Sequence, residues 1–337
     1  MEIEPRLGAM TRRDTLLAVL VPVIWGFNFV VIEWGMHDVP PMLFVALRFT
    51  AVVLPAVFLV PRPDAGWRTV ALVGVFMSLG QFGFLYTSMH LGMSPGLAAL
   101  VLQAQVLFTV LIAAFWLRER PTRGQVVGVL VGAAGLVVVG IGRGGHIPLS
   151  ALLLCLAGAL SWGVGNVVSR SAGVKSGLSL AVWSSLVVPV PLLGLSLVLD
   201  GPHEVGHALA HLGPEALLST LYTAGLASLV GYSIFNGLLA RYPASSVVPF
   251  VLVAPPVAMV SAWALLDQVP NAAELAGGLV VLLGVVVTTR SAAGSAPAAL
   301  GVPRSGGVGE VDEGRDDPAR GEVGAELVHL LDGAEPR

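Results

Sequence analysis

The chain has 337 residues, of which 55% are hydrophobic and 12% are charged, and its mean hydropathy is +0.84. Soluble domains carry about 25% charged residues, so the composition excludes an ordinary soluble domain and predicts an all-α integral membrane protein. The net charge of −3 is unevenly distributed, because residues 291–337 hold nine acidic and four basic residues. The single cysteine, Cys155, lies in an apolar run, so neither a disulfide framework nor a cysteine-ligated metal site is expected.

Ten apolar runs are long enough to cross a membrane. A hydrocarbon core about 30 Å thick needs about 20 apolar residues per helix. The spans are predicted at 15–36, 41–60, 68–89, 95–117, 123–141, 148–169, 178–199, 215–239, 244–266 and 271–289. Residues 1–14 precede them. Residues 291–337 are rich in Gly, Ala, Pro and acidic residues and are predicted to be a disordered tail, because they cannot bury enough apolar surface to fold.

Basic residues predict the orientation, because Lys and Arg are retained on the cytoplasmic side of a membrane. With the N-terminus inside, the outer loops hold only Arg143, whereas twelve basic residues fall on the cytoplasmic side. These are Arg6, Arg12, Arg13, Arg62, Arg68, Arg118, Arg120, Arg123, Arg170, Lys175, Arg241 and Arg290. Both termini and the tail are therefore predicted to be cytoplasmic.

Two ionisable residues lie inside the first two spans, where such groups are costly and mark functional candidates. Glu33 and Arg48 lie seven residues on either side of the Pro40-Pro41 turn. This spacing places them at the same depth in neighbouring antiparallel helices and predicts a salt bridge. The pair would either be a gate or clamp at the outer end of the two helices, or recognise the charges of a zwitterionic substrate.

Uncharged polar residues lie in three further positions of the bundle. Gln103 is in the middle of the fourth span, and Asn28 and Asn166 follow Trp-Gly pairs that begin at Trp25 and Trp162. A small residue beside an aromatic one lets helices approach and gives a rigid wall for an organic substrate, so these five residues are predicted to line a substrate cavity. Interhelical hydrogen bonding by Asn and Gln is the alternative. Weaker candidates are Gln81, Tyr86, Gln105, Trp183, Tyr222, Tyr232 and Asn236.

The loop 200–213 contains the sequence HEVGH. On a helix, His203 and His207 would share one face with Glu204 beside them, which is the arrangement of a zinc metalloprotease. His211 lies about 12 Å from His203 at a rise of about 1.5 Å per residue, so the three histidines cannot bind one zinc ion. A membrane metalloprotease stays open as the alternative function, whereas a solvated helix face without metal is favoured.

The two halves of the chain match each other. WGFNFVV from Trp25 corresponds to WGVGNVV from Trp162, and residues 115–139 correspond to 264–288. In the second match Pro121, Gly128 and Gly135 fall on Pro270, Gly277 and Gly284. The sequence thus predicts two five-helix repeats, 15–141 and 148–290. Because five is an odd number, the second copy must run inverted, which is a signature of secondary transporters whose substrate site lies where the copies meet.

Two stretches also carry a resemblance to a known family. They are WGFNFVVIEWGMHDVPPMLFVALRF in the first two spans and SPGLAALVLQAQVLFTVLIAAFWLRERPTRGQVVGVLVGAAGLVVV in the fourth and fifth. With their weaker echo in the second half, residues 15–290 resemble the EamA-type exporters of the drug/metabolite transporter superfamily, and most of all its exporters of cysteine-pathway metabolites and other amino acids. The resemblance implies a bacterial inner-membrane protein. Glu33 stands where the family usually has a lysine, so a substrate assignment that depended on that lysine would not transfer.

The sequence therefore predicts a ten-helix secondary transporter that exports small polar metabolites, amino acids or their derivatives, by alternating access. No catalytic residue, cofactor or metal is predicted, and the chain is not expected to be an enzyme. Its expected partners are a small-molecule substrate and the lipid bilayer, with no nucleic acid, and a homo-oligomer is left open.

Overall fold

A computed structural model describes residues 10–142, 147–173 and 176–293 of the chain. All secondary structure within these residues is helical, and ten of the helices are long and apolar enough to cross a membrane. The predicted all-α class and the ten predicted spans are confirmed. The predicted tail lies outside the described residues from position 294 onward, as do the first nine residues, while residues 291–293 continue the last helix.

Several spans are built from more than one helical segment, and we number the spans 1 to 10 in chain order. The first repeat holds span 1, α1 (Arg12–Gly35); span 2, α2 (Pro41–Leu59); span 3, α3 (Trp67–Val73), η1 (Gly74–Gly80) and α4 (Gln81–His90); span 4, α5 (Pro95–Val101) and α6 (Ala104–Trp116); and span 5, α7 (Arg123–Gly142). The second repeat holds span 6, α8 (Leu149–Ser171); span 7, α9 (Gly177–Ser184), η2 (Ser185–Val187) and α10 (Pro189–Leu199); span 8, α12 (Pro214–Leu221), η3 (Tyr222–Val230) and α13 (Gly231–Leu239); span 9, α14 (Ala244–Val251) and α15 (Ala254–Leu266); and span 10, α16 (Ala272–Ala293). The short helix α11 (Pro202–Ala210) joins spans 7 and 8.

Successive spans alternate in direction, so the turns between them sort into two ends of the bundle. The α11 end carries α11 and the turns at 36–40, 91–94 and 267–271. The Arg12 end carries the start of α1 and the turns at 60–66, 117–122 and 240–243. At the α11 end, Asn271 Nδ2 donates to the carbonyl oxygen of Gly142 at 3.1 Å, which joins two of its turns.

The two repeats share the same irregularities along their helices. Span 3 contains the π-helical segment η1 and span 8 contains η3. Span 4 is interrupted at residues 102–103, and span 9 is interrupted at residues 252–253. In span 9 the interruption precedes Pro255 and Pro256, which have no N–H to donate to the preceding turn. Span 4 has no proline at its break, so the interruption is a property of the repeat and does not depend on proline.

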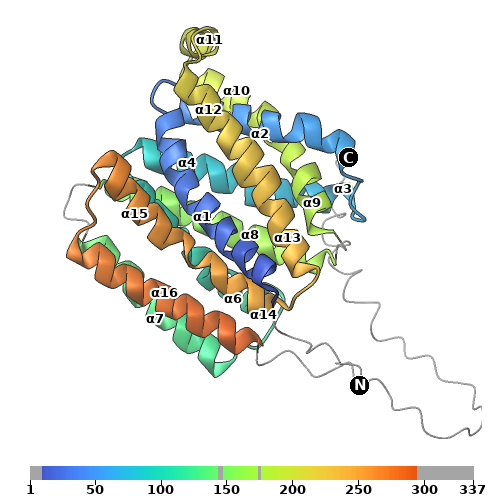
Figure 1. Ribbon diagram of the computed structural model, residues 1–337, viewed down its shortest axis with the longest axis vertical. Helices are drawn as coiled ribbons and strands as arrows, with labels where there is room; N and C mark the ends of the chain where they lie inside the picture. The colour runs from blue at the N-terminus through green and yellow to red at the C-terminus, as the bar shows by residue number, and fades with distance from the viewer. Residues whose placement is uncertain (1–9, 143–146, 174–175, 294–337) are drawn as a thin grey trace, which may run out of the picture. The chain divides into compact units, whose positions relative to one another are not determined.

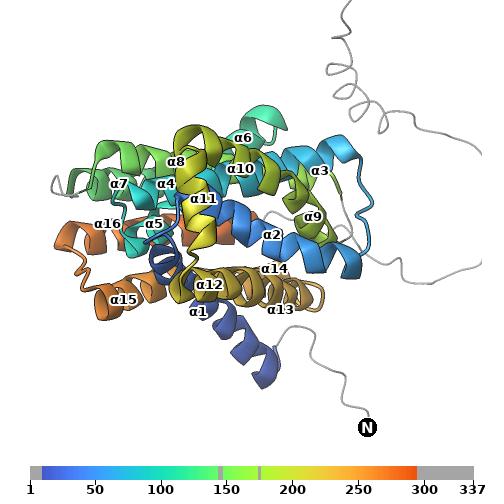
Figure 2. The same ribbon diagram turned by 90° about the horizontal axis from the view of Figure 1, so that it is seen from above.

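Each repeat packs against the other in an exchanged arrangement. Span 1 packs on spans 8 and 9, span 6 packs on spans 3 and 4, span 2 pairs with span 7, and span 5 pairs with span 10. Figure 1 shows α1 between α15 and the α12–α13 pair, with α7 and α16 side by side, and Figure 2 shows the bundle from above. Equivalent helices therefore make equivalent contacts in the two halves, as an inverted duplication requires.

Glycines at matching repeat positions let spans 5 and 10 meet backbone to backbone. A Cβ atom built at Gly128 would lie 2.7 Å from the carbonyl oxygen of Gly284, and one at Gly135 would lie 2.8 Å from that of Gly277. Lipid tails are as apolar as leucine, so close packing of small residues stabilises helix association in a bilayer. The glycine matches found in the sequence thus mark one interface between the repeats.

The largest apolar cluster gathers at the α11 end. It includes Met36, Leu43, Met93 and Ile147, together with Val205 of α11, and all five side chains are buried. Close packing of this kind excludes space for a solute. The α11 end of the bundle is therefore densely packed around these side chains. A second, smaller cavity lies at the same end beside Ile147 and Glu274, with an empty volume of about 450 Å³ that includes the part open to the outside.

Candidate functional site

A cavity lies between the two repeats, in the half of the bundle toward the Arg12 end. It extends from Arg48, near the middle of span 2, to Ser169 and Gly177, at the Arg12 end of spans 6 and 7. Its empty volume is about 760 Å³, including the part that is open to the outside. The lining residues are Arg48, Phe49, Val52, Val73, Met77, Ser78, Gln81, Phe82, Trp162, Ser169, Gly177, Leu178, Leu180, Ala181, Val182, Ser184, Ser185, Ser228, Leu229 and Tyr232.

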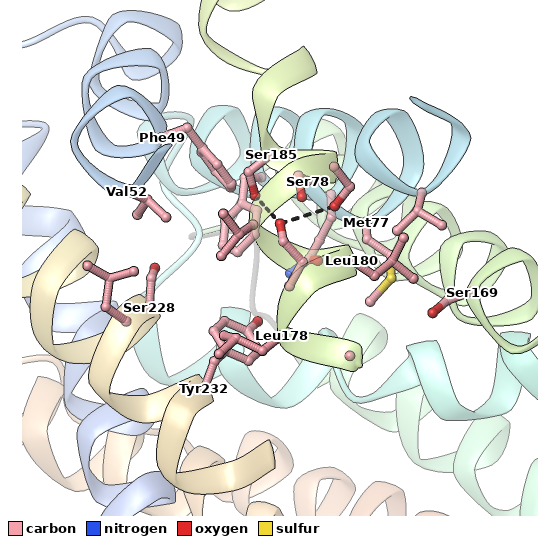
Figure 3. A pocket seen from close by; sticks show the side chains of 18 of the residues that line it. Phe49, Val52, Met77, Ser78, Ser169, Leu178, Leu180, Ser185, Ser228 and Tyr232 are labelled. Carbon is pink, nitrogen blue, oxygen red and sulfur yellow. Dashed lines mark hydrogen bonds between the residues drawn. The ribbon is translucent and has the colours of Figure 1, made fainter. Parts of the chain in front are cut away.

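The cavity wall combines apolar side chains with hydroxyl groups, and Arg48 is the one charged residue among the described residues that line it. Figure 3 shows Ser78, Ser185, Ser228 and Tyr232 approaching from three different spans around the same space. The hydroxyl of Ser185 donates to the carbonyl oxygen of Ala181 at 2.7 Å, which accompanies the short 3₁₀ turn η2 in the middle of span 7. The arrangement suits a small organic solute with few polar groups.

Arg48 is held in the wall by contacts with two neighbouring spans, 3 and 8, and it is only 3% exposed. Its Nη1 donates to the Tyr86 hydroxyl at 3.0 Å and its Nη2 to the Ser228 hydroxyl at 3.2 Å. The guanidinium also lies 4.3 Å from the centre of the Phe82 ring, a favourable cation–π distance. Its Nε is buried and has no hydrogen-bond partner in the described part of the chain.

The predicted salt bridge between Glu33 and Arg48 is wrong. The arginine donates to Tyr86 and Ser228, and Glu33 Oε2 is buried without a hydrogen-bond partner among residues 10–142, 147–173 and 176–293. Equal depth on two sides of a turn fixes the height of each side chain in the membrane. It does not fix the direction in which each helix presents that side chain.

The two tryptophans of the repeated WG motif have different surroundings. Trp25 Nε1 donates to the carbonyl oxygen of Ala227 at 2.9 Å, and its ring packs on Tyr232 and Phe235 at centroid distances of 5.2 and 5.3 Å. Trp162 lines the cavity. Thus Trp162 and Arg48 are the predicted site residues that the structure brings to the cavity, joined there by the weaker candidates Gln81 and Tyr232.

The predicted amide residues lie outside the cavity lining. Asn166 Nδ2 donates to Gln105 Oε1 at 2.7 Å and to Thr109 Oγ1 at 3.2 Å, which is the interhelical hydrogen bonding considered as the alternative. Asn28 is 7% exposed, and its Oδ1 has no hydrogen-bond partner among the described residues. Gln103 is equally buried at the break between α5 and α6.

Sequence reasoning missed the serines of the cavity wall. Ser78, Ser184, Ser185 and Ser228 come from spans 3, 7 and 8. Serine is common in membrane helices as a small packing residue, so a single serine is a weak signal. The pair Ser184-Ser185 inside an otherwise apolar run was the one pattern in the sequence that pointed to this wall.

A polar cluster at the Arg12 end was also missed. Asp14 Oδ2 accepts hydrogen bonds from the Tyr242 hydroxyl at 2.7 Å and from Thr11 Oγ1 at 2.9 Å, and Asp14 Oδ1 lies 2.9 Å from Arg241 Nη1. These contacts join the start of span 1 to the turn between spans 8 and 9. They hold together two elements of different repeats at the end of the bundle to which the cavity extends.

The HEVGH residues lie on α11, where His203, Glu204 and His207 are exposed. The rings of His207 and His211 stack with their centroids 4.4 Å apart. No group of three or more His, Cys, Asp or Glu residues in the described part of the chain could hold a metal ion. The metalloprotease alternative is therefore not supported.

Comparison with protein families decides the class of the protein. Two copies of the model of the EamA-like transporter family match the chain, at residues 14–141 and 149–290. The chain belongs to the EamA-like transporter family. The predicted resemblance is thereby confirmed, and each family copy covers one set of five spans in this transporter.

Two relatives of this EamA-like transporter carry the same name. The chain is 39% identical over 284 residues to a probable amino-acid metabolite efflux pump of Salmonella typhimurium, covering 82% of this chain and 95% of the relative. It is 37% identical over the same length, with the same coverage, to the protein of that name in Escherichia coli. A protein of known crystal structure shares 23% identity and a TM-score of 0.56 over 82% of this chain and 98% of its own length, which shows a similar fold.

Proposed function

We propose that this EamA-like transporter exports small polar metabolites, amino acids or their derivatives, across the bacterial inner membrane by alternating access. The observation that carries the proposal is the cavity between the two repeats, which extends from the middle of the bundle to the Arg12 end, while buried apolar side chains pack toward the α11 end. A site at the interface of inverted repeats, reached from one side at a time, is what alternating access requires. The names of the two efflux-pump relatives support the substrate class.

The proposed orientation places the Arg12 end and both termini in the cytoplasm. Twelve basic residues support it, because they belong to the segments on that side. In this orientation the cavity faces the cytoplasm, where an exporter must load its solute. The Asp14 cluster would then close or release the cytoplasmic end as the two repeats move.

For the solute path we propose Trp25, Asn28, Gln103, Trp162 and Asn166 as contact residues in the course of the transport cycle. Trp162 is in the cavity wall, and the four others lie on spans 1, 4 and 6, which pack on the spans that form the wall. Rocking of one repeat against the other would bring further residues of these spans to the solute. Glu33 remains a proposed gate residue toward the α11 end, without Arg48 as its ion-pair partner.

The experiment that tests export is untargeted mass spectrometry of the culture medium from bacteria that produce the protein. We expect a specific amino acid or derivative to accumulate, with His207→Ala retaining the effect and Asn166→Ala losing it at equal membrane abundance. If no version enriches any metabolite, or if the activity disappears with His207, the export proposal is wrong.

A further inference from the structure

Arg48 carries a charge that no acidic side chain in the described part of the chain neutralises. It is 3% exposed, and both of its described hydrogen-bond partners, the hydroxyls of Tyr86 and Ser228, are uncharged. The ion pairs found among the described residues involve other cations, Arg170 with Glu119 and Arg241 with Asp14, apart from His37 with Asp38 on the surface. Burying an unpaired charge in a membrane protein is costly, so such a group normally has an anionic partner at some stage of its function.

The geometry leaves Arg48 with unused capacity to bind an anion. Nη1 and Nη2 each make one hydrogen bond, and Nε is buried without a partner among the described residues. A guanidinium presents five N–H donors in a planar fork that matches the two oxygens of a carboxylate. The ring of Phe82 at 4.3 Å and the bond to Tyr86 hold that fork in place before any solute arrives.

The surroundings of Arg48 limit the rest of the solute. The described residues that line the cavity include no Asp or Glu, so a second positive charge on the solute would meet no opposite charge from them. They include no Lys and no Arg other than Arg48, so a second carboxylate would be unpaired by them as well. The hydroxyl oxygens of Ser78, Ser184 and Ser185 can accept hydrogen bonds from one ammonium group, and Val52, Met77 and Leu180 offer apolar contact.

We propose that Arg48 binds the carboxylate of the exported solute, and that the substrate is a small monocarboxylate whose side chain is uncharged, such as a neutral amino acid. This inference rests on the proposed export function and names the solute class that the cavity accepts. Basic amino acids and dicarboxylates are disfavoured because their extra charge has no partner in the wall.

The test uses the full-length chain in proteoliposomes loaded with an equimolar mixture of the neutral L-amino acids, L-lysine and L-glutamate, with efflux of each compound followed by mass spectrometry. Parallel vesicles hold the corresponding amino-acid amides, which lack the carboxylate but keep the side chain. We expect one or more neutral amino acids to leave, and their amides, lysine and glutamate to leave at least about tenfold more slowly, because a charge-assisted bidentate contact is lost or an unpaired charge is added.

Variants separate binding from a purely structural role. Arg48→Gln is expected to raise the KM for the transported amino acid at least about tenfold and to abolish the preference for acid over amide. Arg48→Lys, which keeps the charge but not the fork, should keep part of that preference. The matched control is Arg62→Gln, the same change at an exposed arginine over the Trp67 ring, which should leave efflux unchanged.

Each outcome decides a different question. If neutral amino acids and their amides leave equally fast, the carboxylate assignment is overturned while export stands. If lysine or glutamate leaves as fast as the neutral amino acids, the limit to uncharged side chains is overturned while export stands. If the wild-type chain moves none of the compounds, both this inference and the proposed function fail. If Arg48→Gln does not yield folded protein, the comparison of acids with amides in the wild-type chain still decides the matter.

Discussion

Trp25 and Trp162 occupy the same position in the two repeats but lie in different surroundings. At the junction of span 1 with span 8, the Trp25 indole donates to the carbonyl oxygen of Ala227 within the π-helical segment η3. At the junction of span 6 with span 3, the corresponding hydrogen bond comes from Ser161, the residue before Trp162. Its hydroxyl donates to the carbonyl oxygen of Phe76 in η1 at 2.8 Å. Trp162 is left free to line the cavity.

Glycines make room for these donors at both junctions. A Cβ atom built at Gly231 would lie 2.6 Å from Trp25 Nε1, and one at Gly80 would lie 2.4 Å from Ser161 Oγ. A π-helical turn is wider than an α-helical one and is frequent at functional sites. The duplication thus preserved the backbone and the hydrogen bond to each π-helical segment, while the side chain that supplies the bond diverged. As a result, only one of the two equivalent tryptophans lines the cavity.

The largest expected difference concerns the glycines after the tryptophans, which lie where span 1 packs on span 9 and where span 6 packs on span 4. A Cβ at Gly26 would lie 2.5 Å from the carbonyl oxygen of Ala254, whereas the nearest atom to a Cβ at Gly163 is Phe108 Cβ at 3.0 Å. We expect Gly26→Ala to lower the free energy of unfolding by about 1–3 kcal/mol, and Gly163→Ala by less than about 1 kcal/mol. Denaturation by SDS in mixed micelles measures both; equal losses would show that the junctions are equally tight.

The tryptophans themselves should separate stability from transport. Trp25→Phe removes the hydrogen bond to Ala227 and is expected to lower the free energy of unfolding by about 0.5–1.5 kcal/mol. It should raise KM less than Trp162→Phe does, because Trp25 lies outside the cavity lining. Trp162→Phe should leave the thermal midpoint nearly unchanged and raise KM, because it alters the cavity wall. Thermal unfolding and proteoliposome efflux on the same preparations check the pair, and a reversed pattern would contradict the division of roles.

The asparagines of spans 1 and 6 are expected to give a smaller difference. Asn166→Leu removes the bonds to Gln105 and Thr109 and is expected to lower the free energy of unfolding by about 0.5–1 kcal/mol, since interhelical bonds in membranes average about 0.6 kcal/mol. Asn28→Leu removes a buried oxygen without a partner among the described residues, so stability should be unchanged or slightly higher. If Asn28→Leu nevertheless abolishes efflux, Asn28 contacts the solute; if it destabilises like Asn166→Leu, its amide has a structural partner in the membrane.

The smallest expected effect is at α11. His207 lies on an exposed face of α11. His207→Ala should therefore change the free energy of unfolding by less than about 0.5 kcal/mol, and efflux should be unaffected. Purified protein is expected to hold less than stoichiometric zinc by elemental analysis, and a chelator should leave efflux intact. Loss of efflux on chelation would contradict this expectation and would indicate that the HEVGH motif binds a metal ion.

The spans and the repeat were predictable because their causes are local. Bilayer thickness sets the length of each apolar run. The matching glycines and prolines of the two repeats can be found by aligning the two halves of the amino-acid sequence. The site was predicted less completely. Arg48 and Trp162 were found because a charge or an aromatic beside glycine is rare inside a span, whereas the cavity serines are common residues there and gave a weak signal.

The sequence by itself determined the number of spans, the inverted duplication and the transporter family. Only the tertiary structure decided which side chains meet: Arg48 with Tyr86 and Ser228 instead of Glu33, and Trp25 with Ala227 while Trp162 faces the cavity. The physical reason is that lipid is as apolar as the protein core. A membrane helix that is apolar all round shows no stripe that marks its inward face, so its rotation is set by long-range packing of glycines and polar side chains.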